Sequence, residues 1–271
     1  MTRHLLRTEL VKQWHRPRTY ALSGLMMLVP VVAAIAIKLN PPTLGGRDDA
    51  FSFFTTGTGL LLPVAVLRFL AKFFLVVVVV LVAGDAVASE ARWGNLRSTL
   101  TRPVGRGRLL VAKAGSSACF GVVTLLLTLA TALVAGIVVF GWHPLDVAGV
   151  HQSQGEILAN LALMSVYVLW GTAAFAALAF MVSTMVDSPV LAALAGFGLY
   201  VASLLLDNIT SLGVIRSVLP THDSEAWTTL FVGTNWGPTV DMVRGALVQL
   251  AYVVVFAGIA WRSFRRRDIC W

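Results

Sequence analysis

Charged residues are scarce in this chain. Only 13% of its 271 residues are Asp, Glu, Lys or Arg, whereas 57% are hydrophobic and the mean hydropathy is +0.80. Because a soluble domain carries about 25% charged residues, this composition indicates a protein embedded in lipid. A hydrocarbon layer about 30 Å thick needs roughly 20 apolar residues per helix, and the chain holds enough for about six such helices.

Cysteine is also scarce, and several catalytic motifs are missing. Cys119 lies in an apolar run and Cys270 near the C-terminus, so neither a disulfide framework nor a metal cluster is expected. The first apolar run follows a long charged stretch without a small-residue cleavage site, so no cleavable signal is expected. The sequence lacks the Gly-x-x-x-x-Gly-Lys-(Ser/Thr) phosphate loop, the Gly-x-Ser-x-Gly motif and the His-Glu-x-x-His motif.

The positive charge is concentrated in three segments. They hold 15 of the 21 Lys and Arg residues. These are Arg3, Arg7, Lys12, Arg16 and Arg18 near the N-terminus; Arg92, Arg97, Arg102, Arg106, Arg108 and Lys113 in the centre; and Arg262, Arg265, Arg266 and Arg267 near the C-terminus. Cations at span ends mark the cytoplasmic side, so we expect a multi-pass plasma-membrane protein with both termini in the cytoplasm. The same distribution disfavours nucleic acid as a partner.

The apolar runs predict an all-α membrane protein with one transmembrane domain of six spans. The expected spans are 20–38, 67–88, 109–140, 157–186, 190–206 and 241–264. Residues 1–18 precede them, with Leu6, Leu10 and Trp14 on one helical face. We expect an interfacial helix there, with its basic side chains toward anionic headgroups and its end at Pro17. A solvated basic tail is the alternative.

Two stretches are harder to assign. Residues 51–66 contain Gly57, Gly59 and Pro63 and precede Arg68 and Lys72. We interpret 51–66 as an interfacial or re-entrant segment, with both cations reaching outward at the external end of span two. One tilted helix from Leu60, its cations facing a polar cavity, is the alternative.

Residues 207–240 are too polar to cross the membrane and too aromatic for a free loop. Short helices at or within the outer interface, anchored by tryptophans, fit this composition best. His222, Asp223 and Glu225 lie close together there, but their number and spacing fall short of a metal site.

The most informative stretch is the central segment, residues 89–108, between spans two and three. It holds too much charge for hydrocarbon, yet Leu96, Leu100 and Val104 recur at helical spacing. Pro103 and the glycines after it end the helix before the next apolar run. These features predict a short basic helix at the membrane face, suited to docking on a partner. An ordinary basic loop that fixes topology is the alternative.

The order of these parts resembles the permease subunit of type-2 ATP-binding-cassette (ABC) exporters. The central segment also resembles a local pattern of that family: an acidic residue, Gly-(Thr/Asn)-Leu-Arg, Leu-x-x-Pro-x-x-Arg, then Leu and Lys. The pattern is carried by Glu90, Gly94, Asn95, Leu96, Arg97, Leu100, Pro103, Arg106, Leu109, Leu110 and Lys113. Asn95 departs from the common Thr without displacing a charge. The layout covers essentially the whole chain, but only this segment is specific at the level of residues.

The resemblance implies that the segment is a coupling helix, which docks on a nucleotide-binding subunit. Its coupling residues would be Glu90, Gly94, Leu96, Arg97, Leu100, Arg102, Pro103 and Arg106. The leucines would fill an apolar groove and the arginines would meet acidic rims or headgroups. ATP and Mg²⁺ would be bound by a separate ATPase, and this chain would itself hold no cofactor, metal or catalytic residue. A second permease subunit, identical or homologous, would complete the pathway.

The resemblance also implies that spans one, two and five line the transport route. Phe73, Phe74, Phe197 and Tyr200 make that route apolar, which favours efflux of an amphipathic drug, antibiotic or lipid-like cargo. An intramembrane protease or lipid-modifying enzyme is a rival reading, and so is a membrane scaffold or channel. The first needs reactive groups that converge inside spans, and the second needs no docking helix.

Overall fold

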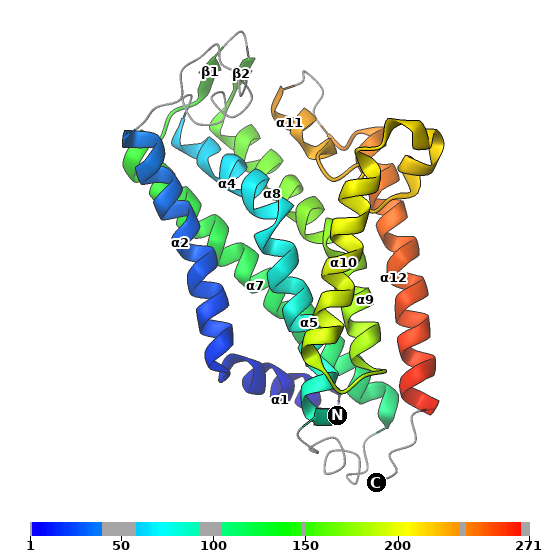
Figure 1. Ribbon diagram of the computed structural model, residues 1–271. Coiled ribbons are helices and arrows are strands. Elements are labelled where there is room, and N and C mark those ends of the chain that lie inside the picture. The colour runs from blue at the N-terminus through cyan, green and yellow to red at the C-terminus, as the bar shows by residue number, and fades with distance from the viewer. Residues whose placement is uncertain (1, 40–57, 93–104, 148–149, 233–236, 267–271) are drawn as a thin grey trace.

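The computed structural model describes residues 2–39, 58–92, 105–147, 150–232 and 237–266, and it shows an elongated helical bundle (Figure 1). It contains six helical stretches that are long and apolar enough to cross a membrane, as the composition predicts. They are α2 (Pro17–Leu39), α5 (Phe74–Arg92), α7 (Arg106–Phe140), α8 with α9 (Gln154–Gly171 and Ala173–Ser183), α10 (Pro189–Asp207) and α12 (Val240–Arg266).

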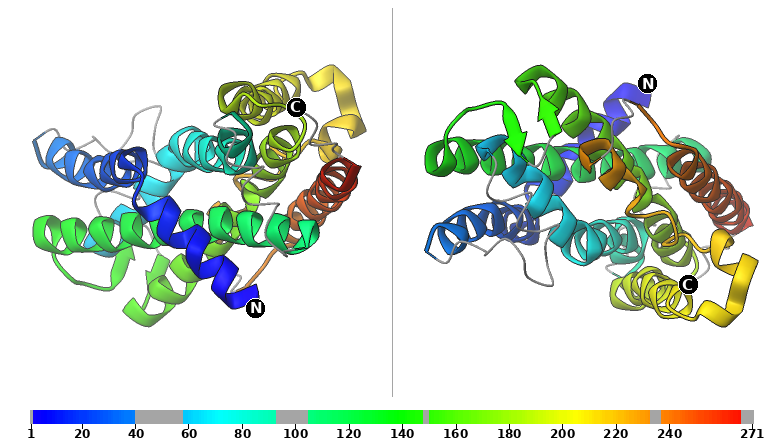
Figure 2. Two further views of the ribbon diagram at one scale, coloured as in Figure 1. Left: turned by 90° about the horizontal axis from the view of Figure 1, so that it is seen from below. Right: turned by 90° about the horizontal axis from the view of Figure 1, so that it is seen from above.

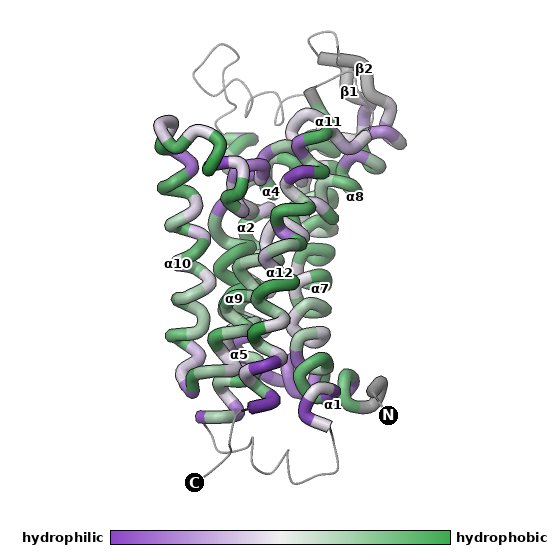
Figure 3. Tube along the Cα trace, turned by 90° about the vertical axis from the view of Figure 1, so that its right-hand side faces the viewer, coloured by the Kyte–Doolittle hydropathy of each residue, from purple (hydrophilic) through white to green (hydrophobic). Residues whose placement is uncertain are grey.

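The two ends of the bundle differ. One end, here called the terminal face, carries α1 (Thr2–Trp14), the last turns of α5 and α12 and the first turn of α7. The opposite end, the loop face, carries the strands β1 (Leu145–Val147) and β2 (Val150–Gln152), the 3₁₀ helices η2 (Thr210–Val218) and η3 (Ala226–Thr228), and α11 (Thr229–Val232). Hydrophilic residues gather toward both ends and hydrophobic residues along the middle (Figure 3). This distribution is consistent with a multi-pass membrane protein.

The helix α1 lies across the terminal face at a steep angle to the bundle (Figures 1 and 2). The change of direction occurs after Trp14, and Pro17 is the first residue of α2, a position that needs no backbone N–H. Pro17 therefore begins α2 instead of ending α1. The ring of Trp14 packs edge-on against Phe120 of α7, with the ring centroids 5.9 Å apart.

The second span is divided differently from the sequence prediction. A 3₁₀ turn, η1 (Gly59–Leu61), leads into α4 (Leu62–Lys72), and α5 begins only at Phe74. The predicted span 67–88 therefore crosses a helix boundary. In the described part of the uncertain 51–66 stretch, Leu60, Leu61 and Val64 are fully buried within the bundle. The oxygen of Gly59 would lie 2.1 Å from a Cβ placed on Gly136 of α7, so two glycines allow this close approach.

Two further features were not predicted from the sequence. Between the predicted spans 109–140 and 157–186, residues 145–147 and 150–152 pair as a small antiparallel hairpin with Asp146 opposite His151. The fourth span bends at Thr172, between α8 and α9. There Gln249 of α12 donates to the carbonyls of Gly171 (2.9 Å) and Pro220 (2.8 Å), and its side-chain oxygen accepts from the N–H of Ala174 at 3.0 Å. This buried amide supplies partners for backbone groups that the bend releases.

Candidate functional site

A group of oppositely charged side chains lies at the terminal face, where α1 meets α5 and α7. Its centre is Lys113 of α7, whose side chain is only 2% exposed. The Lys113 ammonium lies 2.8 Å from Glu90 Oε1 of α5 and 3.1 Å from Glu9 Oε2 of α1. One buried lysine therefore joins three helices.

Three more cations complete the group from the side of α1 and α2. Lys12 lies 3.1 Å from Glu9 Oε1 and 3.5 Å from Glu90 Oε1. Arg16, between α1 and α2, and Arg18, in the first turn of α2, both contact Asp85 Oδ2 of α5. We call these seven residues the charge cluster: Glu9, Lys12, Arg16, Arg18, Asp85, Glu90 and Lys113. Three of the five basic side chains that were expected to face headgroups, Lys12, Arg16 and Arg18, thus pair with carboxylates of the protein.

The charges of the cluster stabilise one another against burial. Burial alone raises the pKa of Glu9, but the ammonium groups of Lys113 and Lys12 attract and hydrogen-bond its carboxylate, and its pKa falls below the ordinary 4.5. Burial lowers the pKa of Lys12, but Glu9 and Glu90 more than offset this and its pKa is raised above 10.5. Both groups are therefore charged at neutral pH.

Each of the two α5 carboxylates is held through one oxygen. Within the part of the chain that the structure describes, the other oxygens, Glu90 Oε2 and Asp85 Oδ1, are buried without a hydrogen-bond partner. Buried carboxylate oxygens are normally paired. The cluster therefore retains two acceptors for further donors.

The cluster lies at the base of the segment that joins α5 to α7. We call residues 93–105 the connector; of these, 93–104 lie outside the described residues. Glu90 is in the last turn of α5, before the connector, and Lys113 is in the third turn of α7, after it. The ion pair between them fixes the two helices that hold the connector, and Glu9 adds α1 to the same unit.

The structure accounts for part of the predicted coupling residues. Six of them fall outside the described residues: Gly94, Leu96, Arg97, Leu100, Arg102 and Pro103. Glu90 is buried in the charge cluster instead of facing a partner. Arg106 is exposed at the start of α7, and its Nη1 donates to the carbonyl of Arg265 in α12 at 3.2 Å.

The four aromatic residues expected along the transport route lie together. Phe73 contacts Phe74 and Phe197 edge-on, with ring centroids 5.3 Å and 5.8 Å apart. Phe197 of α10 lies 6.2 Å from Tyr200, whose ring also packs on Phe175 of α9. Phe73 is half exposed and Tyr200 is buried, so the group runs from the surface of the bundle into its core.

The ionisable residues near the loop face form separate pairs. Lys72 lies 2.6 Å and Arg68 lies 3.6 Å from the carboxylate of Glu225, so these cations pair with the 207–240 segment. His222 contacts Asp207 at 2.7 Å, and Asp223 receives a bidentate contact from Arg244. Among the described residues, no group of three or more His, Cys, Asp or Glu side chains could hold a metal ion.

The cluster as a unit does not follow from the sequence pattern, in which Lys113 is one of the central cations and the last residue of the motif, and Glu9 belongs to no motif. Two signals were present: Lys113 stands in the first part of a long apolar helix, and an ionisable residue at such a position needs a partner. Glu9 is the only acid in α1, three residues before Lys12.

Comparison with known proteins gives a family without an assigned activity. Residues 27–270 match the family model described as "Protein of unknown function (DUF2705)". The "Uncharacterized protein YhcI" of Bacillus subtilis (strain 168) is 27% identical over 206 residues, which cover 70% of this chain and 63% of the relative. The match therefore spans less than two thirds of the relative's length. The family model covers nearly the whole chain, and the chain belongs to the DUF2705 family of proteins of unknown function.

Proposed function

We propose that this chain is the membrane-spanning subunit of an ATP-driven exporter of the type-2 ABC family. In this proposal the connector is a cytoplasmic coupling helix that docks on a separate ATPase subunit. Two copies of the chain, or this chain and a homologue, form the pathway. The proposal rests on the sequence pattern of residues 90–113, and one structural observation supports it above the others: the charge cluster joins both ends of the connector to α1.

A segment that transmits movement needs stiff attachments, because coupling passes through packed elements that move together. Lys113 is almost fully buried and bound to Glu90 and Glu9. A push on the connector would therefore move α5, α7 and α1 together. A topological loop, in contrast, needs no buried ion pairs at its base.

The orientation follows from the same face. The terminal face carries α1, the first turn of α7 and the C-terminal end of α12, and each of these contains described residues of one of the three segments rich in Lys and Arg. By the positive-inside rule this face is cytoplasmic, α1 is the interfacial helix, and the short helices at the loop face are external. The cell membrane is the expected location.

The cargo class is inferred from the aromatic group of Phe73, Phe74, Phe197 and Tyr200. Three of these side chains offer only hydrocarbon, and the Tyr200 hydroxyl is buried without a hydrogen-bond partner among the described residues. Such a surface suits an amphipathic molecule that contributes one polar group. We therefore expect efflux of a drug, an antibiotic or a lipid-like compound.

The rival functions make different demands. An intramembrane enzyme needs reactive groups that converge, but the described acids of the terminal face pair with cations. A scaffold or channel is compatible with the bundle, but it requires no ATPase. Copurification separates these classes, because an exporter subunit brings a phosphate-loop ATPase, whereas an intramembrane enzyme acts alone.

The test is a pull-down of the full chain from its own host in mild detergent, with mass spectrometry of the partners. We expect an ATPase to copurify with the wild type and with Ser98→Asp, and to be lost with Leu100→Asp. Both variants add the same negative charge. Leu100 belongs to the apolar repeat of the connector, whereas Ser98 lies between its members, so only Leu100→Asp places the charge on the apolar face. No ATPase with the wild type, or equal recovery with Leu100→Asp, would refute the proposal.

A further inference from the structure

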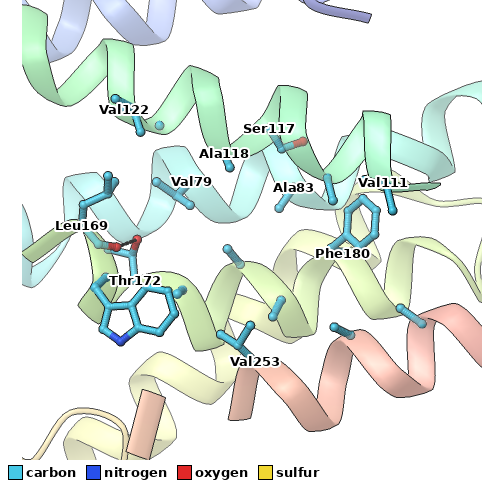
Figure 4. A pocket seen from close by; sticks show the side chains of 18 of the residues that line it. Val79, Ala83, Val111, Ser117, Ala118, Val122, Leu169, Thr172, Phe180 and Val253 are labelled. Carbon is cyan, nitrogen blue, oxygen red and sulfur yellow. Dashed lines mark hydrogen bonds between the residues drawn. The ribbon is translucent and has the colours of Figure 1, made fainter. Parts of the chain in front are cut away.

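An apolar cavity of about 540 Å³ lies inside the bundle (Figure 4), and no residue of the aromatic group or of the charge cluster lines it. Its walls come from α5, α7, α8, α9 and α12, with Val111, Val122, Phe180 and Val253 among the residues that line it. Val111 is 56% exposed and Val122 is 40% exposed, so the cavity opens at the surface of α7. Its volume falls within the range of about 300–1,000 Å³ that is typical of ligand sites.

The walls offer an occupant mostly hydrocarbon. Of the 21 residues that line the cavity, only Ser117, Thr172, Trp170 and Trp261 have polar side-chain atoms. Three of these donate to backbone carbonyls: Ser117 to Lys113 at 3.1 Å, Thr172 to Leu169 at 2.7 Å, and the Trp170 indole to Ala246 at 3.0 Å. Such a cavity does not hold water, so a suitable occupant would be an apolar chain.

The cavity has the length of one lipid leaflet. Along α7 it extends from Leu110 to Val122, which is about 18 Å at a rise of about 1.5 Å per residue. Half of a typical hydrocarbon layer is about 15 Å. At its end nearest the terminal face α7 and α12 come into contact: a Cβ on Gly107 would lie 2.3 Å from the ring of Trp261. Val111, one turn further along α7, is exposed and leaves the cavity open to the surface beside this contact. A lipid chain would therefore enter there, with its headgroup at the terminal face.

Arginines flank this end of the cavity. Arg108 precedes Val111 by one turn of α7, and Arg265 follows Trp261 by one turn of α12. Both are exposed, and neither has an acidic partner within the described part of the chain. Arg106 links the two helices by donating to the Arg265 carbonyl. The positive end of the α7 dipole adds to this charge, and the charge complements a phosphate group.

We propose that this cavity is a binding site for an anionic phospholipid of the leaflet at the terminal face. One acyl chain lies between α7 and α12, and the headgroup contacts Arg108 and Arg265. The bound lipid fills the space beside the contact that Gly107 of α7 makes with Trp261 of α12. Lipid binding at this site requires a bilayer around the chain but no ATPase, so it can be tested independently of the exporter function.

The test uses the purified chain in micelles that contain equal amounts of dioleoylphosphatidylglycerol and dioleoylphosphatidylcholine. Native mass spectrometry counts the lipids that remain bound. We expect the wild type to retain phosphatidylglycerol in about tenfold or greater excess, given the attraction of two arginines for an anionic headgroup. Val111→Trp, which fills the mouth, should lose both lipids. Arg108→Gln with Arg265→Gln should keep lipid but lose the preference.

Two matched controls separate the site from general effects. Val134→Trp enlarges another exposed residue of α7, outside the cavity, and should retain lipid as the wild type does. Arg266→Gln removes another exposed arginine of α12, which lies about 140° around the helix from Trp261, and should keep the preference. Size-exclusion chromatography verifies that each variant is folded. Equal retention of both lipids by the wild type, or unchanged retention by Val111→Trp, would overturn the proposal. A disulfide between two copies of the Val122→Cys variant would also overturn it, because a second copy would then occupy the cavity.

Discussion

Replacing Lys113 with methionine tests the charge cluster most severely. The change keeps the length of the side chain but removes its charge, which leaves the Glu9 and Glu90 carboxylates close together. Their side chains are 10% and 8% exposed, so water screens them little. Breaking a buried ion pair in this way costs about 3–5 kcal/mol. Lys12 still contacts both carboxylates, so we expect a loss near 3 kcal/mol.

The matched control is Lys12→Met. Lys12 neutralises the same two carboxylates, but its side chain is 44% exposed, and exposed pairs contribute only about 0–1 kcal/mol. For a chain of this size, 1 kcal/mol shifts the midpoint of thermal unfolding by roughly 2–4 °C. Lys113→Met should therefore lower the midpoint by roughly 6–12 °C, and Lys12→Met by less than about 4 °C.

The assay is thermal unfolding in detergent, followed by tryptophan fluorescence and by loss of the monodisperse peak. A second variant, Lys113→Met with Glu90→Gln, removes one of the two carboxylates left without Lys113. It should recover part of the loss, because residues within one network are not additive. Equal effects of the two lysine variants, or no recovery in the double variant, would show that Lys113 does not hold the helices together.

Three further predictions follow from other contacts. Because the pKa of Glu9 is lowered below 4.5, its stabilisation of α1 is present above about pH 4.5 and is lost as the pH falls through the pKa that Glu9 has in the folded chain. Trp14 fluorescence should change only in that acidic range. A transition between pH 5 and pH 8 would contradict this. Gly136→Ala should destabilise by about 1–3 kcal/mol through overpacking, whereas Gly258→Ala, with open space around it, should not; equal unfolding midpoints would refute the close approach of η1 and α7. Gln249→Leu leaves buried backbone groups unpaired and should lower the free energy of unfolding by about 1–3 kcal/mol for each unpaired group, with faster backbone hydrogen exchange at the α8–α9 bend. Unchanged exchange there would contradict the role assigned to Gln249.

The sequence was most informative where one physical requirement dominates. Apolar length alone predicts helices long enough to span a membrane, and six are found. Hydropathy could not place the break near Phe73, because apolar residues dominate on both sides of it and Arg68 and Lys72 are also compatible with one continuous span whose cations reach outward. The bend at Thr172 depends on Gln249, which is 77 residues away.

The candidate site was predictable only in part for a similar reason. The pattern around the connector identified Glu90 and Lys113, which are close in sequence. Glu9 is 104 residues from Lys113, and no local pattern links them; only the fold of α1 back across the terminal face brings them together. The hairpin at 145–152 escaped prediction because strands of three residues have no detectable period.

The central claim is that the connector contacts a separate ATPase on the cytoplasmic side. A photo-cross-linking residue at position 100, in intact cells of the native host, tests it most directly, with the same residue at position 142 near the loop face as the control. We predict that position 100 captures an ATPase with a phosphate loop and that position 142 captures none. Capture of that ATPase only from position 142, or no capture from position 100, would contradict the account.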